Sequence, residues 1–148
     1  MVYDQREEAD GGMTAKERGG RLRTRGIAVK RVYERPSSDD GLRVLVDGLW
    51  PRGIAKAALK YDAWPRALAP SNALRKWYGH NRSRAAEFRR RYRKELASHH
   101  DELAALRAMI RGRPATLLTA TRELELSHAM VLRDVLSPAR PRKRVAEV

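Results

Sequence analysis

The side chains best able to bind an anion follow two predicted buried strands. Asp47 and the turn Trp50-Pro51-Arg52-Gly53 come after one apolar strand, and residues 119–123 follow another. In open α/β sheets the carboxyl ends of the parallel strands meet at one edge, where ligands bind. An arginine can hold a carboxylate or phosphate through two parallel hydrogen bonds. The pattern therefore predicts an anion site at this edge, with Arg52 as the best single candidate contact.

Arg31 and Asp47 allow two interpretations. Arg31 lies within a predicted strand, where an unpaired guanidinium would be costly to bury. It either forms a structural ion pair with Asp47, or Asp47 orients the Arg31 guanidinium toward a ligand. Arg43, in the next strand, also requires a partner. For Trp50, a packed turn is the plainer interpretation and a stacking surface for a ligand is the alternative.

Two predicted helix starts add further candidates. Ser71 is expected to cap a helix, but Ser71 and the N–H groups of the first turn could instead hold an anion, with Arg75 one turn later. His128 follows Ser127, the expected cap of the last helix. His128 either packs there or acts as a general acid or base, and Asp47 is the other candidate for proton transfer.

A metal or cofactor is not expected. His99 and His100 lie near two glutamates, but adjacent residues project about 100° apart on a helix and cannot share one face. The absence of Cys excludes thiolate nucleophiles, iron–sulfur clusters and Cys-based zinc sites. No Gly-rich phosphate loop or other catalytic motif with defined spacing occurs.

The charge of the chain suggests a second function. The 148 residues include 32 Lys and Arg against 18 Asp and Glu, a net charge of +14, and an excess of this size is common in nucleic-acid-binding proteins. The alternative hypothesis is therefore a nucleic-acid-binding module that uses the C-terminal basic tail and one helix face. A solvated Arg-rich helix is the plainer interpretation. The candidate contacts on that face are Arg84, Arg89, Arg90, Arg91, Arg93 and Lys94.

Hydrophobic patterning predicts the elements that position these side chains. Apolar and alternating segments predict strands, and stripes at three- and four-residue spacing predict helices. Buried strands separated by helices favour an α/β fold, with a small, mostly parallel sheet, helices on its faces and Rossmann-like layering. The predicted strands cover 27–33, 42–47 and 115–120, and the predicted helices cover 71–78, 83–99, 101–111 and 128–136.

The same patterning predicts one domain over residues 27–136. Residues 1–26 are expected to form a disordered extension, and residues 137–148 a basic disordered tail. No apolar stretch approaches the roughly 20 residues that cross a bilayer, and the polar N-terminus lacks the apolar core of a signal peptide. We therefore expect a cytoplasmic protein without a membrane partner.

The segment Gly41 to Gly53, which ends in Leu-Trp-Pro-Arg-Gly, closely resembles the YeaO-like family of bacterial proteins, part of domain of unknown function 488. The resemblance continues to about Leu136 and implies a small α/β domain with Rossmann-like layering. It implies little about activity. The residues themselves predict a pocket for an anionic small molecule or nucleotide, lined by Arg31, Asp47, Trp50, Arg52, Ser71 and Arg75. A protein-binding adaptor is a third possibility.

Overall fold

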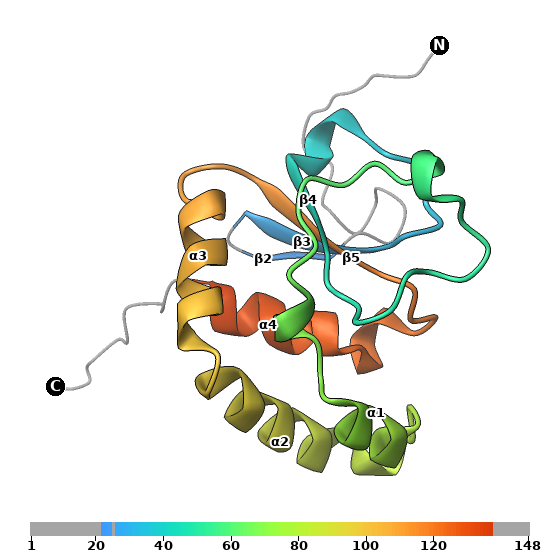
Figure 1. Cartoon of the computed structure of the whole chain (residues 1–148), viewed down its shortest axis with the longest axis vertical. Coiled ribbons are helices and arrows are strands. Elements are labelled where there is room, and N and C mark those ends of the chain that lie inside the picture. Colours follow the sequence, from blue (N-terminus) through green and yellow to red (C-terminus); the bar gives the residue numbers. More distant parts are fainter. Residues whose placement is uncertain (1–21, 25, 138–148) are drawn as a thin grey trace, which may run out of the picture.

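A four-stranded sheet forms the centre of the computed structural model, which describes residues 22–24 and 26–137 (Figure 1). The strand order is β2-β3-β5-β4. β3 and β4 each pair in parallel with β5, and β2 pairs antiparallel with β3. The predicted mostly parallel sheet is therefore confirmed, with β5 at its centre. The strands are β2 (Leu22–Thr24), β3 (Ile27–Arg31), β4 (Leu42–Leu45) and β5 (Ala115–Thr119).

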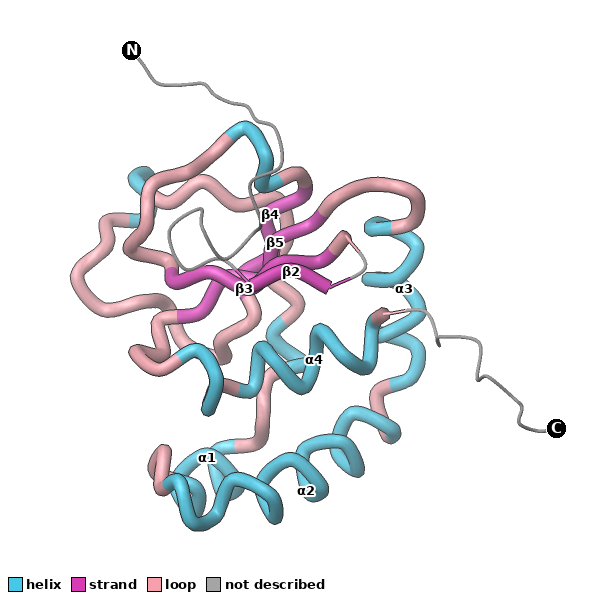
Figure 2. Tube along the Cα trace, turned by 180° about the vertical axis from the view of Figure 1, so that it is seen from behind, coloured by secondary structure: helices cyan, strands magenta, loops and turns pink. Residues whose placement is uncertain are grey.

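The four α-helices lie on one face of the sheet, as Figures 1 and 2 show from opposite sides. Three of them, α1 (Asn72–Tyr78), α2 (Ala85–Ala97) and α3 (His100–Ile110), connect β4 to β5. The fourth, α4 (His128–Leu136), follows β5 and packs between the sheet and α2. The structure confirms the α/β fold, although the helices cover one face only.

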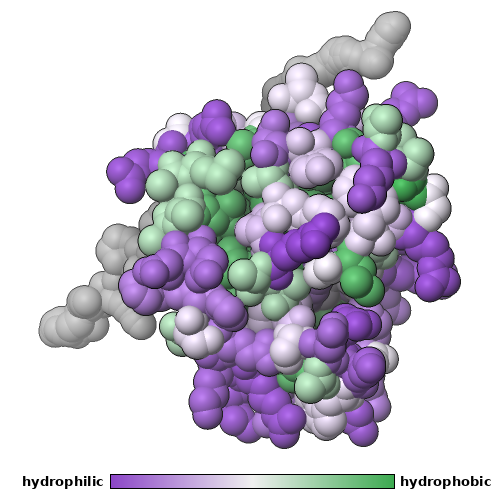
Figure 3. All heavy atoms as spheres, viewed as in Figure 1, coloured by the Kyte–Doolittle hydropathy of each residue, from purple (hydrophilic) through white to green (hydrophobic). Residues whose placement is uncertain are grey.

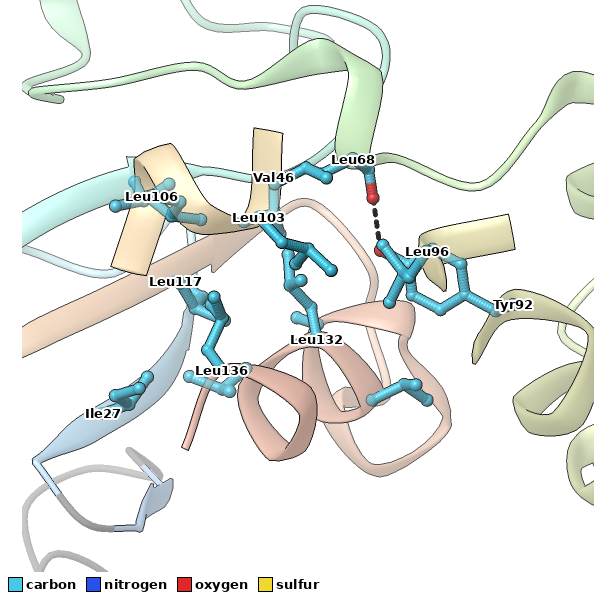
Figure 4. Packing of buried hydrophobic residues seen from close by; sticks show 14 of the residues in the cluster. Ile27, Val46, Leu68, Tyr92, Leu96, Leu103, Leu106, Leu117, Leu132 and Leu136 are labelled. Carbon is cyan, nitrogen blue, oxygen red and sulfur yellow. Dashed lines mark hydrogen bonds between the residues drawn. The ribbon is translucent and has the colours of Figure 1, made fainter. Parts of the chain in front are cut away.

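The main core fills the space between the sheet and these helices. Val29, Val44 and Leu117 project from three neighbouring strands and are fully buried. Leu132 of α4 packs on the same side, and Tyr92 of α2 donates its hydroxyl to the carbonyl oxygen of Leu68 (Figure 4). The alternation of strand side chains explains why every second residue faces the helices.

A loop covers the opposite face of the sheet. Leu45 and Leu118 project to that side, where Leu59 is buried against them. Trp50 and Trp64, both from the loop after β4, pack on this second cluster. Because both faces are covered, Val44, Leu45 and Val46 are all fully buried. The sequence predicted a strand that is buried on both faces, and the cover on both sides of the sheet confirms this explanation of the continuous apolar run.

A buried ion cluster connects β3, β4 and the loop between them. Asp40 is 1% exposed and contacts both Lys30, at 3.1 Å, and the guanidinium of Arg43. The Nε of Arg43 also donates to the carbonyl oxygen of Lys60. Burial alone would raise the pKa of Asp40, but the Ser37 N–H and the two cations together hold it below its usual value. Asp40 is thus the partner that Arg43 requires.

The predicted apolar stripe of α2 is confirmed. Ala85, Phe88, Tyr92 and Leu96 are buried against the core at four-residue or near four-residue spacing. A short 3-10 helix over Arg82–Arg84 precedes α2, so the α-helix begins two residues later than the sequence suggested. Hydrophilic side chains cover the lower part of the molecule in Figure 3, over α1 and α2.

Two details differ from the sequence-based expectations. Residues 22–24, assigned to the N-terminal extension, form β2 because they pair with β3. Ser127 precedes α4 but does not cap it, since its hydroxyl donates to the carbonyl oxygen of Leu124. Residues 1–21 and 138–148, which include most of both predicted tails, lie outside the described residues. Within the described residues, the helices are too short or too polar to cross a bilayer.

Candidate functional site

The parallel sheet opens between β4 and β5 at its carboxyl edge. The N–H of Val46 still donates to the carbonyl oxygen of Leu118, at 3.0 Å. A continued parallel ladder would next join the Ala120 N–H to the carbonyl oxygen of Val46. The Ala120 N–H instead donates to Oδ2 of Asp47, at 2.8 Å, and Nε2 of His128 lies 2.9 Å from the Val46 carbonyl oxygen. Two side chains therefore satisfy the backbone groups of the missing rung.

Asp47 is held by groups from three elements. Its Oδ1 accepts a hydrogen bond from Thr119 at 2.7 Å and lies 3.3 Å from Nε2 of His128. Burial by itself would raise the pKa of Asp47, but His128, the Ala120 N–H and the Thr119 hydroxyl lower the pKa below its usual value. Both carboxylate oxygens are thus occupied by the protein itself. Asp47 is suited to orienting its neighbours rather than to contacting a ligand.

A pocket of about 570 Å³ lies at this opening, within the usual size range of small-molecule sites. Its walls come from the loop after β4, the region of α1, the loop after β5 and the start of α4. Apolar groups such as Leu49 and Pro70 line it together with a few polar side chains. The polar and aromatic side chains in the lining are Asp47, Trp50, Arg52, Asn72, Arg75, Tyr78, His80, Phe88, Thr121 and His128.

Arg52 and Arg75 give the pocket its positive charge. Both side chains are exposed, and neither is paired with a carboxylate in the described part of the chain. The guanidinium of Arg75 donates to the Asn72 side chain at 3.1 Å, which fixes its position without neutralising its charge. Asp47 is the one acidic residue in the lining, and its oxygens are occupied as described above. The charged side chains of the lining therefore sum to a net positive charge.

Arg31 does not line the pocket, and the expected ion pair with Asp47 is not formed. Its Nε donates to the carbonyl oxygen of Thr121 at 3.2 Å, and its guanidinium lies 4.8 Å from the centre of the Tyr33 ring. Tyr33 in turn donates its hydroxyl to the carbonyl oxygen of Arg52. Arg31 and Tyr33 thus connect the two loops that flank the pocket.

Ser71 also lies outside the pocket lining. Its hydroxyl accepts from the Leu74 N–H, which confirms that Ser71 caps α1. The Glu95 carboxylate of α2 then accepts from both the Ser71 hydroxyl, at 2.6 Å, and the Ser71 N–H, at 2.9 Å. A carboxylate of the protein therefore occupies the place where we considered an external anion.

Trp50 lines the pocket but is also part of the packed loop. Its Nε1 donates to the carbonyl oxygen of Ile54 at 2.6 Å, and its ring meets Tyr61 and Trp64 edge to face. These contacts fix the turn that carries Arg52, in which Gly53 has a φ of +84°. The plainer interpretation of Trp50 as a packing residue thus accounts for its contacts.

The six candidate nucleic-acid contacts on and before α2 are all exposed, but they are not equivalent. Arg90 and Arg91 pair with Glu87, and Arg84 and Arg91 lie over the Trp77 ring. The other three have no hydrogen-bond or ion-pair partner in the described part of the chain. These are Arg89, Arg93 and Lys94.

Sequence reasoning missed His80, which lines the pocket. The candidates at the start of α1 and in residues 119–123 included Asn72, Thr119 and Thr121: Asn72 and Thr121 line the pocket, and the Thr119 hydroxyl donates to Asp47. His80 carries a positive φ of 55°, which is rare outside glycine. Its position directly after Gly79, the residue that ends α1, is the one sequence signal that pointed to an unusual backbone there.

The family model that matches this chain covers residues 26–147, which is the whole described domain beyond β2. The chain belongs to the DUF488-N3i family, described as the inactive DUF488-N3 subclade. This agrees with the resemblance to the YeaO-like proteins of domain of unknown function 488. The description of the subclade as inactive bears on the choice between a binding and a catalytic role for the pocket.

Two curated relatives show how far the DUF488-N3i similarity extends. The uncharacterized protein YeaO of Escherichia coli (strain K12) is 42% identical over 110 residues, which is 74% of this chain and 96% of YeaO. The uncharacterized protein Rv3073c of Mycobacterium tuberculosis (strain H37Rv) is 45% identical over 113 residues, 75% of this chain and 93% of the relative. No solved structure matches the chain.

Proposed function

We propose that the pocket binds a small anionic molecule that carries a phosphate or carboxylate group, a class that includes nucleotides. The observation that carries the proposal is the presence of two arginines, Arg52 and Arg75, in one preformed pocket at the carboxyl edge of the sheet. Neither has a carboxylate partner among the described residues. Guanidinium groups bind such oxyanions with two hydrogen bonds each. The apolar part of the lining would contact the rest of the ligand.

Binding without a chemical step is the role that the family description favours. The DUF488-N3i subclade is described as inactive. Asp47, one of two candidates for proton transfer, already has both oxygens occupied by Thr119, Ala120 and His128. His128 is the other candidate, and we assign it a binding role below. We propose that the protein binds its ligand in the cytoplasm.

A thermal-shift screen of anionic metabolites tests this proposal. A ligand present at a hundred times its Kd should raise the free energy of unfolding by about 2.7 kcal/mol and raise Tm. Arg52→Gln removes a charged donor worth about 1.5–3 kcal/mol, so the stabilisation should fall at the same ligand concentration. Arg93→Gln is the matched control, because Arg93 is exposed on α2 and outside the pocket. A screen without stabilising anions, or equal stabilisation of Arg52→Gln, would contradict the proposal.

Nucleic-acid binding remains the alternative. The observation that favours it is the exposed cationic group of Arg89, Arg93 and Lys94, which have no ion-pair partner among the described residues. The backbone of DNA or RNA would contact this face of α2, and the affinity would fall as a power of the salt concentration. We expect a triple Gln variant of these residues to lose that salt-dependent binding while the pocket still binds small anions. Absent or salt-independent binding to both nucleic acids would exclude the alternative.

A further inference from the structure

The hydrogen bonds of His128 determine which of its ring nitrogens can meet a ligand. Nε2 lies 2.9 Å from the carbonyl oxygen of Val46, and a carbonyl oxygen can only accept. Nε2 therefore carries a hydrogen, which Asp47 Oδ1 at 3.3 Å can share. Nδ1 has no hydrogen-bond partner in the described part of the chain, and the ring contributes to the pocket wall. Nδ1 is thus the nitrogen available to a ligand.

Charged and titratable groups face the His128 ring from several elements. Asp47, after β4, is the carboxylate in contact with it. From α2, the Tyr92 ring meets it edge to face at 5.9 Å, and Glu95 on the same helix is instead bound to Ser71. The cationic side chains that share the pocket are Arg52, Arg75 and, when protonated, His80.

An anion can accept a hydrogen bond from Nδ1 only when the imidazole is protonated. In the neutral ring with Nε2–H, Nδ1 presents a lone pair, which repels an anionic oxygen. In the imidazolium both nitrogens donate, so Nε2 keeps its bond to Val46 while Nδ1 gains a hydrogen that an anionic oxygen can accept. We infer that His128, as the imidazolium, is the third cationic contact of an oxyanion held by Arg52 and Arg75, and that Asp47 is its positioning residue. This inference rests on the proposed function.

The inference makes anion binding dependent on pH. Each bound oxyanion requires a proton at Nδ1, which comes from solvent when the free protein holds a neutral His128. The affinity should therefore be highest where His128 is already protonated. Where the ring is neutral, the affinity should fall by up to tenfold for each further pH unit, because one proton must be taken up for each anion bound. Asp47 supports the charged ring through its own negative charge and through the fixed orientation of Nε2–H.

Inorganic sulfate is a suitable probe because its charge stays constant between about pH 5 and 8, the range in which His titrates. We expect the Kd for sulfate, measured by chemical-shift titration of the full chain, to rise with pH in the parent protein. His128→Gln should remove that dependence, since a Gln amide can still donate to Val46 but cannot be protonated. His80→Gln, which replaces the other histidine of the pocket, is the matched control. This variant should retain the pH dependence of the Kd.

The Asp47→Asn variant tests the positioning role. Loss of the negative charge beside the ring should move the midpoint of the sulfate pH profile to lower pH, whereas a purely structural role would leave the midpoint in place. An unchanged midpoint would overturn the assignment of Asp47 as the positioning residue of His128.

A measurement on the parent protein keeps the inference testable if a variant does not fold. The ¹⁵N shifts of the His128 ring should show Nε2 protonated and Nδ1 unprotonated at high pH, and sulfate should then shift Nδ1 toward the protonated form. The opposite tautomer, or an Nδ1 that does not respond to saturating sulfate, would overturn the inference. Binding that depends on Arg52 but not on pH would overturn it while leaving the proposed function intact. Absence of sulfate, phosphate and carboxylate binding would overturn both.

Discussion

The Asp47 carboxylate lies 3.3 Å from Nε2 of His128, at the point where β4 and β5 separate. Asp47 accepts the N–H that the next rung of the sheet would use, and His128 contacts the carbonyl oxygen of that rung. The opening of the sheet therefore leaves neither backbone group unsatisfied. The same two side chains form part of the pocket wall, so local folding and the candidate site depend on one pair.

Substitutions of His128 should separate its structural and binding contributions. His128→Ala leaves the carbonyl oxygen of Val46 without its donor, which should lower the free energy of unfolding by about 1–3 kcal/mol in urea denaturation. His128→Gln retains a donor and should lose less. Equal stability of the Ala variant and the parent protein would show that water replaces the ring at no cost.

The buried Asp40 should be far less tolerant of substitution. Asp40→Asn leaves the Lys30 and Arg43 charges buried without a carboxylate, and loss of one partner of a buried ion pair costs about 3–5 kcal/mol. We expect a large drop in the urea midpoint at pH 7. Glu125→Gln, at an exposed position without an ion-pair partner among the described residues, is the control and should change stability by less than about 0.5 kcal/mol. Comparable effects of the two substitutions would contradict the assigned role.

Acid should destabilise the domain through Asp40 and Asp47. The pKa values of both carboxyls are lowered in the folded protein. Their contribution to stability is therefore fully present above the unfolded value of about 3.9 and is lost as pH falls through the folded pKa values. Tm measured in steps from neutral pH to about pH 2 should fall most steeply in the acid range. In the Asp40→Asn variant, Tm should fall less steeply as the pH is lowered. A slope identical to that of the parent protein would contradict the contribution assigned to the Asp40 carboxylate.

Gly41 should not tolerate a side chain. It has a φ of +64°, and a Cβ at this position would lie 2.2 Å from the carbonyl oxygen of Pro114. Gly41→Ala combines a positive-φ penalty of about 1–3 kcal/mol with a backbone clash of about 1–3 kcal/mol. Gly53→Ala meets no atom within 4 Å at a φ of +84° and should show the first penalty alone. An equal loss of unfolding free energy in the two variants, measured by urea denaturation, would contradict the close approach of Gly41 to Pro114.

The placement of the site at the carboxyl edge of the sheet follows from the hydrophobic pattern. Val44, Leu45 and Val46 are apolar on both faces, so the residues after them must emerge at that edge. The partners of charged residues could not be assigned in the same way. Arg31 has carbonyl oxygens as partners and Arg43 has Asp40 and Lys60, contacts set by loops whose paths have no periodic signal. The contact that Glu95 of α2 makes with the start of α1 is equally invisible to local patterning, since 24 residues separate Glu95 from Ser71.

A titration of the ¹⁵N-labelled chain with inorganic phosphate, followed through its backbone amides, tests the central claim most directly. We predict saturable shifts at Gly48 to Trp50, at Arg52, at Arg75 and at Ala120 to Thr121, with no shifts for Arg89 to Lys94 on α2. The Arg52→Gln and Arg75→Gln double variant should lose these shifts. Shifts centred on α2, or none at any site, would contradict the assignment of the pocket as the anion-binding site.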